Sequence, residues 1–170
     1  MATNLEFINS FDSGSGNSAI SCDNVFSDKY SSYFVTLRAG YSVQGYSNLR
    51  FIDSAGAVET SATQDTAILM LRSQTTFQER RLVNNSQIER INYTYQNAIG
   101  GDTSFYVHNP YDSSSYTFTQ SQSNGNATTP YFVGNKAIGV HKVAEQLSGI
   151  ILYPSAGTFA NIDVSVYGVK

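Results

Sequence analysis

The chain has 170 residues, a length that fits one domain with a substantial core. Hydrophobic residues make up 41% of it and charged residues 14%, with 12 Tyr, 10 Phe, no Trp and a net charge of −3. This aromatic content excludes intrinsic disorder, and the lack of a basic stripe argues against nucleic-acid binding. Ser, Thr, Asn and Tyr among the polar residues favour strands and turns, so the expected fold class is all-β.

The N-terminal segment and the cysteine content indicate where the chain is made. Residues 1–20 have neither a basic n-region nor an apolar h-region, so we expect no secretion signal. No window approaches the ~18 consecutive apolar residues of a membrane span, so no membrane association is expected. The single cysteine, Cys22, excludes an internal disulfide and is expected to be a small buried hydrophobic residue. Synthesis in a reducing cytoplasm follows from these features.

The first half of the chain alternates between apolar and polar residues in short runs. Leu5 and Phe7, with Phe11 as a further candidate, are expected on one face of a first strand. Residues 67–72 fit a buried strand or a helix start by periodicity, and the Thr75-Thr76-Phe77 that follows favours a strand. Further strands are expected at residues 19–22, 33–39 and 49–52, and polar surface loops at residues 57–66 and 78–87.

The second half continues the same alternation. Strands are expected at residues 91–95, 103–107, 115–121 and 137–143, with a long polar loop at residues 121–130. From Gly149 onward we expect a terminal hairpin, in which Ile162, Val164 and Val166 point into the core while Asp163 and Ser165 point outward. About ten strands with short turns and no fixed-period repeat favour an antiparallel β-sandwich in a single domain of residues 1–170.

Residues that support catalysis or metal binding are sparse. His108 and His141 belong to no ligand cluster, and a hydrogen-bonded structural role is expected for His141. No Gly-x-Ser-x-Gly motif is present, so neither an enzyme nor a cofactor or metal site is expected. Aspartates are expected in loops at residues 53, 65, 102 and 112, where Asp caps turns. Calcium binding at Asp102 or Asp112 is the minor alternative, and a pair of carboxylates that cleaves a glycosidic bond is another.

Tyrosines and one arginine pair are the candidates for contact with a partner. Tyrosines in or near expected loops could stack on sugars or anchor a protein, although padding of a sandwich edge or a subunit interface is the favoured interpretation. Arg80-Arg81 is the densest basic spot, interpreted as solvated or salt-bridged between subunits, with phosphate binding as the minor alternative. The tyrosines concerned are Tyr41, Tyr46, Tyr111 and Tyr131.

Several motifs resemble a family of small virion proteins of tailed phages. An apolar strand precedes Pro-Ser-Ala-Gly-Thr-Phe at residues 154–159, and the chain finishes in Val-Ser-Val-Tyr-Gly-Val at residues 164–169. The N-terminal segments are Leu-Glu-Phe-Ile-Asn-Ser-Phe at residues 5–11 and Val-Phe-Ser-Asp-Lys-Tyr at residues 25–30, and residues 109–117 read Asn-Pro-Tyr-Asp-Ser-Ser-Ser-Tyr-Thr. These motifs resemble head-decoration and tail-fibre modules, often from phages of marine bacteria and cyanobacteria.

The resemblance implies a jelly-roll sandwich and a non-enzymatic structural role on the virion surface, as a capsid decoration protein or tail-fibre module. It also implies a homotrimer that contacts major capsid or tail proteins, and composition favours subunit contacts because Tyr is abundant and Lys scarce. The Arg80-Arg81 region or the tyrosine-bearing loops are expected near that contact. The alternatives are a carbohydrate-binding module that recognises a host-surface glycan and a small glycanase.

Overall fold

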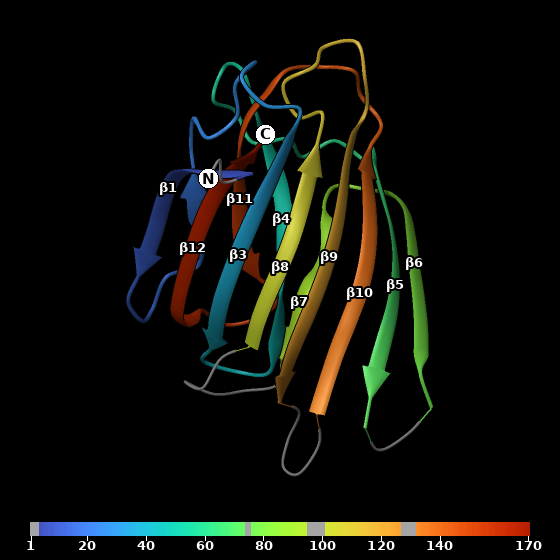
Figure 1. Cartoon of the computed structure of the whole chain (residues 1–170). Coiled ribbons are helices and arrows are strands. Elements are labelled where there is room, and N and C mark those ends of the chain that lie inside the picture. The colour runs from blue at the N-terminus through green and yellow to red at the C-terminus, as the bar shows by residue number, and fades with distance from the viewer. Residues whose placement is uncertain (1–3, 74–75, 95–100, 127–131) are drawn as a thin grey trace.

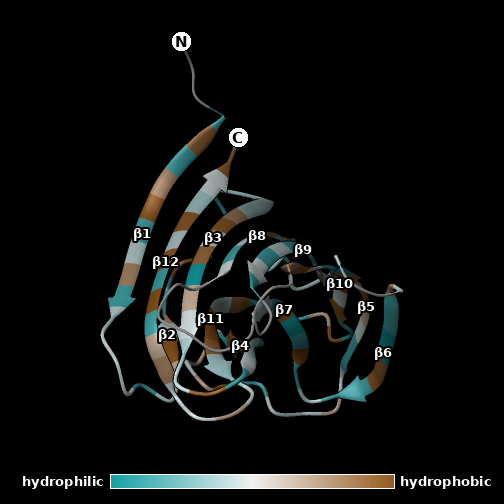
Figure 2. Cartoon of the chain, turned by 90° about the horizontal axis from the view of Figure 1, so that it is seen from below, coloured by the Kyte–Doolittle hydropathy of each residue, from teal (hydrophilic) through white to brown (hydrophobic). Residues whose placement is uncertain are grey.

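The computed structural model describes residues 4–73, 76–94, 101–126 and 132–170, which form twelve antiparallel strands in two sheets and no helix. The smaller sheet has the order β2 (Ile20–Cys22), β11 (Leu147–Pro154), β4 (Gly45–Asp53) and β7 (Ile88–Thr94). The larger sheet lies in front of it in Figure 1 and curves around it in Figure 2. Its order is β1 (Leu5–Ser13), β12 (Phe159–Val169), β3 (Ser32–Tyr41), β8 (Gly101–His108), β9 (Thr117–Asn126), β10 (Phe132–His141), β5 (Gln64–Arg72) and β6 (Gln78–Asn85).

The strand order is that of a jelly roll with two inserted pairs of strands. The pair β5 and β6 is inserted between β4 and β7, and the pair β9 and β10 between β8 and β11. Without them, β1-β12-β3-β8 faces β2-β11-β4-β7, and the chain crosses between the sheets at every step except from β4 to β7. The inserted pairs lie side by side as β9-β10-β5-β6, which we name the extension (Figure 1). The expected sandwich of jelly-roll type is confirmed, with twelve strands instead of about ten.

The last strand lies in the core with the expected register. Ile162, Val164 and Val166 on β12 are at most 1% exposed, whereas Asp163 is exposed and Ser165 half-buried. β12 pairs with β1 on one side and β3 on the other. A slip of one residue would place the Asp163 carboxylate in an apolar core, so hydrophobic burial fixes this register.

The expected terminal hairpin is wrong. β11 belongs to the smaller sheet and β12 to the larger one, so residues 155–158 carry the chain across the sandwich. Gly157 has a φ of 64° in this crossing, and a Cβ there would lie 2.6 Å from the Ser42 Oγ. Phe159 follows with a fully buried ring. A turn between two apolar strands has the same sequence signature whether it joins neighbouring strands of one sheet or strands of the two different sheets.

Two stretches expected to be polar loops are strands. Residues 78–85 form β6, whose side chains are mostly exposed because an edge strand of the extension has a neighbour on one side only. Residues 121–126 continue β9, where Ser121 and Ser123 face inward. The Ser123 hydroxyl donates a hydrogen bond of 2.9 Å to Asn135 Oδ1 on β10. Polar side chains, among them the hydrogen-bonded Ser123 and Asn135, line this part of the interior, so hydrophobicity did not mark the end of β9.

A bulge in β1 separates residues that were expected on one face. The pairing with β12 shifts between Phe7 and Asn9. Leu5 and Phe7 therefore point outward, with 39% and 58% of their surface exposed, whereas Ile8 and Phe11 pack against the core. One extra residue in a strand reverses the direction of the side chains that follow it. The bulge thus places an aromatic ring on the outer face of the larger sheet.

Candidate functional site

Four aromatic rings cross the outer face of the larger sheet in one line. Phe7, Tyr167, Phe34 and Tyr106 are direct cross-strand partners on β1, β12, β3 and β8. Their successive ring centroids lie 5.6, 6.3 and 5.0 Å apart. Phe7 is exposed and the other three are half-buried. We name these four residues the aromatic row. Neighbouring aromatic pairs stabilise a sheet, but rings left on the solvent side also present an apolar surface to a partner.

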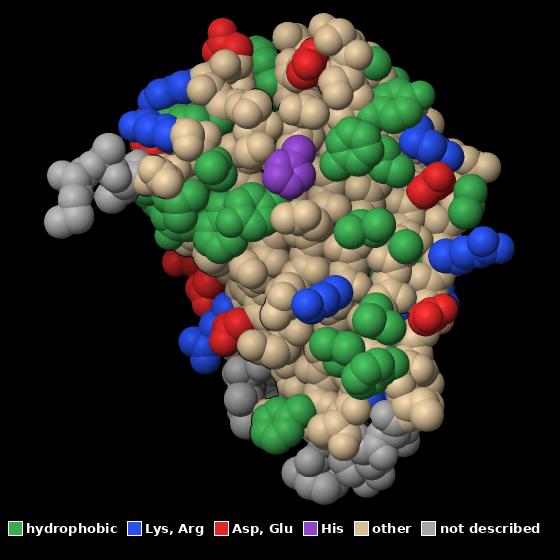
Figure 3. All heavy atoms as spheres, turned by 45° about the vertical axis from the view of Figure 1, so that its right-hand side comes forward, with side chains coloured by type: hydrophobic (Ala, Val, Ile, Leu, Met, Phe, Trp, Pro, Cys, Tyr) green, Lys and Arg blue, Asp and Glu red, His purple; other side chains and the backbone are tan. Residues whose placement is uncertain are grey.

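A histidine extends this apolar surface along β8. The His108 ring stacks on the Tyr106 ring, with centroids 5.8 Å apart and an interplanar angle of 4°. The Ser32 hydroxyl lies 2.9 Å from His108 Nδ1, and burial lowers the pKa of His108 below its usual value, which favours the neutral ring. Phe118 on β9, the cross-strand partner of His108, is 45% exposed. Hydrophobic side chains lie on two sides of the one histidine visible in Figure 3, which is His108 because His141 is fully buried.

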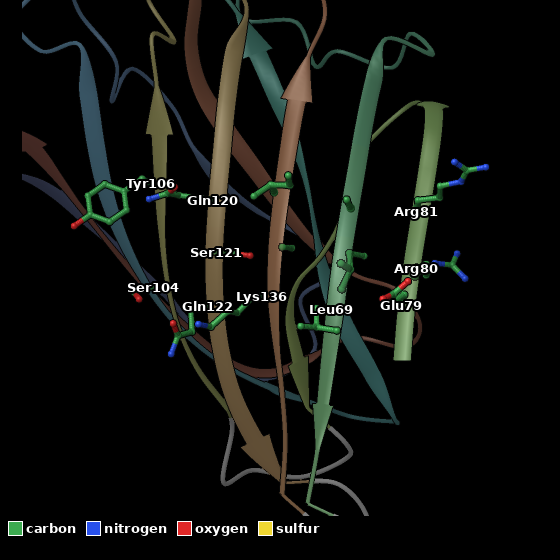
Figure 4. Close-up of a pocket in the computed structure, with 14 residues that line it drawn as sticks. Leu69, Glu79, Arg80, Arg81, Ser104, Tyr106, Gln120, Ser121, Gln122 and Lys136 are labelled. Carbon is green, nitrogen blue, oxygen red and sulfur yellow. The ribbon is translucent and has the colours of Figure 1, made fainter. Parts of the chain in front are cut away.

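The extension carries a shallow groove of about 970 Å³ beside the aromatic row (Figure 4). The line of the aromatic row continues into it from Tyr106 through Gln120, Ile138 and Ala67 to Arg81. A parallel line, two residues further along each strand pair, consists of Ser104, Gln122, Lys136, Leu69 and Glu79. We name the groove that these two lines form the outer groove. Its lining is mixed, with an apolar floor and amide and charged groups.

Charges without a partner gather on the same face of the sheet. Among the described residues, the exposed cations that make no ion pair or hydrogen bond are Arg38, Arg81 and Lys136, and all three point outward from the larger sheet. The remaining lysines pair with carboxylates: Lys29 and Lys170 with Glu6, and Lys142 with Asp65.

An acidic line runs below the aromatic row. Asp12, Asp163 and Asp102 lie on β1, β12 and β8, with Arg38 between the last two on β3. All three carboxylates are exposed. We name these three aspartates the acidic line. The β1-to-β8 part of the outer face is therefore net negative, whereas the groove, with Lys136 and Arg81 against Glu79, is net positive.

The structure places the four predicted contact tyrosines differently from one another. Tyr41 is the last residue of β3 and 1% exposed, so the expected surface contact is wrong for it. Its ring packs in the core, its hydroxyl lies 2.6 Å from Ser47 Oγ, and burial raises its pKa. Tyr46 is half-buried, with the Arg90 guanidinium 4.5 Å from its ring centroid, and Tyr111 packs against the core. Tyr131 lies outside the described residues.

The predicted basic pair is divided by strand alternation. Arg80 and Arg81 lie on β6 and not in a loop, so their side chains point to opposite faces. Arg80 Nη2 lies 3.1 Å from Glu89 Oε2, a salt bridge within the chain. Arg81 points outward at the end of the groove that lies farther from the aromatic row. Arg81 alone is thus available to a partner.

The aromatic row is absent from the contact residues that the sequence suggested. A signal was present, since Phe34 and Tyr106 occupy the solvent side of strands whose alternation was recognised. Their alignment was not readable, because it depends on which strands pair and in which register.

Neither histidine belongs to a metal centre in the described part of the chain, where no three His, Cys, Asp or Glu residues converge. His141 is fully buried, with Nε2 2.6 Å from Glu145 Oε1, which confirms a hydrogen-bonded position. Asp65 and Asp102 lie in strands, contrary to the expected loops, whereas Asp112 caps its own turn by accepting hydrogen bonds from Ser114. Across the described ranges, no helix has the length and apolarity to cross a bilayer.

Comparisons with known proteins give no family. No protein-family model and no curated protein matches the chain. A fructofuranosidase variant from Schwanniomyces occidentalis, solved with fructosylnystose, is 8% identical with a TM-score of 0.22, over 90% of this chain and 34% of that one. The CspB protease of Clostridium perfringens is 9% identical with a TM-score of 0.16, over 92% of this chain and 26% of that one. The chain therefore spans about a third or less of these two structures, and likenesses this weak carry no argument about function.

Proposed function

We propose that the protein is a non-enzymatic structural component on the surface of a tailed-phage particle, as a capsid decoration protein or a tail-fibre module. The observation that carries the proposal is the aromatic row on the outer face of the larger sheet. Contiguous apolar surface on a folded domain marks a contact site, and aromatic residues are enriched at the centre of protein interfaces. The jelly-roll strand order agrees with the fold that the resemblance implies.

The chemistry of this face supports binding more than catalysis. The rings of Phe7 and Phe34 have no ionisable group, and the neighbouring His108 is hydrogen-bonded to Ser32 and has a lowered pKa. Binding through rigid aromatic side chains on paired strands loses little conformational entropy, because the sheet already fixes their positions. A repeated surface component needs such a preformed contact face. In this proposal its partners are major capsid or tail proteins and further copies of itself.

Analysis of purified particles of the phage that encodes the chain tests this role. Quantitative mass spectrometry should find the chain in many copies per particle, at a constant ratio to the major capsid protein or to a tail protein. In a phage that carries Phe7→Ser and Phe34→Ser, this ratio should fall. Val58→Ser, which changes a side chain of 37% exposure outside the aromatic row, should leave it unchanged. Absence of the wild-type chain from particles would contradict the proposal.

A carbohydrate-binding module is the second candidate, and the outer groove favours it. Tyr106 supplies an aromatic face at one end, and Gln120 and Gln122 place two amides beside it, the combination that holds sugar rings and their hydroxyls. A glycan array probed with the purified chain tests this candidate. Binding that Tyr106→Ala abolishes, in a chain absent from particles, would favour it over the structural role.

A further inference from the structure

The geometry points to a head-to-tail contact between copies of this chain, in which the aromatic row of one copy lies in the outer groove of the next. This inference deepens the proposed structural role and rests on it, since it names the surfaces through which the copies assemble. The occupant of the groove is thus a second copy of the chain. Three properties of the two surfaces carry it: their apolar parts, their charges and their positions on the curved sheet.

The apolar parts of the two surfaces match. Ile138 in the outer groove is 63% exposed, and Leu69 and Ala67 beside it are half-buried and exposed. Phe7 in the aromatic row is 58% exposed, with Tyr167 and Phe34 following in line. The aromatic row is a single line of side chains perpendicular to the strands, and the outer groove is lined by two such lines, so one line of rings fits along one groove. Covering both surfaces removes apolar area from water, which favours the contact.

The charges are complementary as well. Lys136 and Arg81 lie in the outer groove without an ion-pair partner in the described residues, and the acidic line lies below the aromatic row. Lys136 is two residues along β10 from Ile138, and Arg38 and Asp102 are four residues along β3 and β8 from Phe34 and Tyr106, on the same side. A rotation axis parallel to the strands leaves the position of each residue along the strand direction unchanged. Rotation about it therefore brings Lys136 of one copy towards the acidic line of the next, while Arg81 approaches the rings, where a cation–π contact is favourable.

The curvature of the larger sheet favours a ring. Figure 2 shows the sheet bending around the smaller one, so the β1-to-β3 end and the β5-to-β6 end face different directions. Each copy therefore offers the aromatic row to one neighbour and the outer groove to the other, as the subunits of a closed ring do. A ring of three copies agrees with the homotrimer that the resemblance implies. It also uses the regions beside both edge strands, β1 and β6.

Mixing two assembly-deficient variants tests the contact. Phe7→Ser with Phe34→Ser removes the row but leaves the groove, and Lys136→Asp with Ile138→Ser removes the groove but leaves the row. By native mass spectrometry the wild type should contain three chains and each variant one. An equimolar mixture should give a complex of two chains, one of each variant, because a single intact row-and-groove contact remains.

Other results would overturn the inference. A wild type of one or two chains, variants that still form trimers, or a mixture that stays monomeric each contradicts a head-to-tail contact. Circular dichroism and thermal melting of both variants identify any that fail to fold. Val58→Ser serves as the matched surface control and should behave as the wild type. Particles that contain the chain together with a failed mixing result would leave the structural role standing and overturn this contact alone.

A charge exchange tests the electrostatic part separately. Lys136→Asp and Asp163→Lys should each weaken assembly by at least about tenfold in dissociation constant, since each places like charges together. The double variant should regain most of the loss, and raised salt should weaken the wild type. Both side chains are exposed, so their replacement should leave the fold intact. If the double variant assembled no more tightly than the weaker of the two single variants, the pairing of Lys136 with Asp163 would be contradicted.

Discussion

Phe34 and Tyr106 lie opposite each other on β3 and β8, with ring centroids 5.0 Å apart, on the solvent side of the sandwich. Their backbone neighbours Val35 and Phe105 point the other way and are fully buried. An aromatic pair of this kind adds about 0.5–1.5 kcal/mol beyond burial, so it contributes to the stability of the sheet. Both rings nevertheless remain half-exposed in the single chain. The rings of Phe34 and Tyr106 pack together as residues of a core do, yet they face the solvent. This is the main structural reason to assign the outer face of the larger sheet to assembly.

The register of β12 gives a stability prediction. Val164→Asp should prevent soluble folding, because a carboxylate at a position of 1% exposure has no partner in the core. Ser165→Asp should be tolerated, because Ser165 points away from the core and is half-buried. Expression of the two variants side by side, with soluble yield and circular dichroism as readouts, provides the comparison. Equal yields of folded protein for both variants would rule out the register described for this strand.

The acid stability of the N-terminal strand should depend on Glu6. Its carboxylate bridges Lys170 at 2.8 Å and Lys29 at 2.5 Å, and these ammonium groups lower the pKa of Glu6 to about 2. Because the folded-state pKa lies below the ordinary value of 4.5, the stabilisation is present above pH 4.5 and lost as the pH falls through 2.

An NMR titration of the Glu6 side-chain carboxyl carbon tests this bridge. We expect a midpoint near 2 in the folded chain, and Glu6→Gln should remove the corresponding part of the pH dependence of stability. Glu59→Gln, on a side chain that is half-buried like Glu6 and makes no ion pair in the described part of the chain, is the matched control. A Glu6 midpoint close to 4.5 would show that the two lysines do not hold the carboxylate in solution.

The thiol of Cys22 should be unreactive in the folded chain. Cys22 is fully buried on β2, and burial, with a smaller effect of Asp23, raises its pKa to about 12. A thiol in this state offers almost no thiolate at pH 8. A chromogenic disulfide reagent at that pH should react with urea-unfolded protein and not with folded protein. Stoichiometric reaction of the folded chain within minutes would contradict the buried position.

Sequence predicted the fold where hydrophobic burial alone decides the structure. The alternation of Ile162, Val164 and Val166 was readable because their face of β12 packs in an apolar core. The end of β9 was missed because its inward residues, Ser121 and Ser123, are polar in a polar part of the interior. β6 was missed because an exposed edge strand needs no hydrophobic pattern.

The candidate site was harder to predict than the fold. Arg81 was identified from local charge, and the structure places it in the outer groove. Tyr41 was assigned to a surface loop from its neighbours, but the tertiary packing buries it. The pairing of Phe7 with Tyr167 joins the first strand to the last one, and it also depends on a bulge that one sequence does not reveal. Only the folded sheet brings these rings into one line.

Light scattering on the purified chain at micromolar concentration tests most directly whether the outer face of the larger sheet holds copies together. We predict a mass three times that of the 18.6 kDa chain, which Phe7→Ser with Phe34→Ser should reduce to the mass of one chain. A wild-type mass of 18.6 kDa that does not change with protein concentration would contradict it.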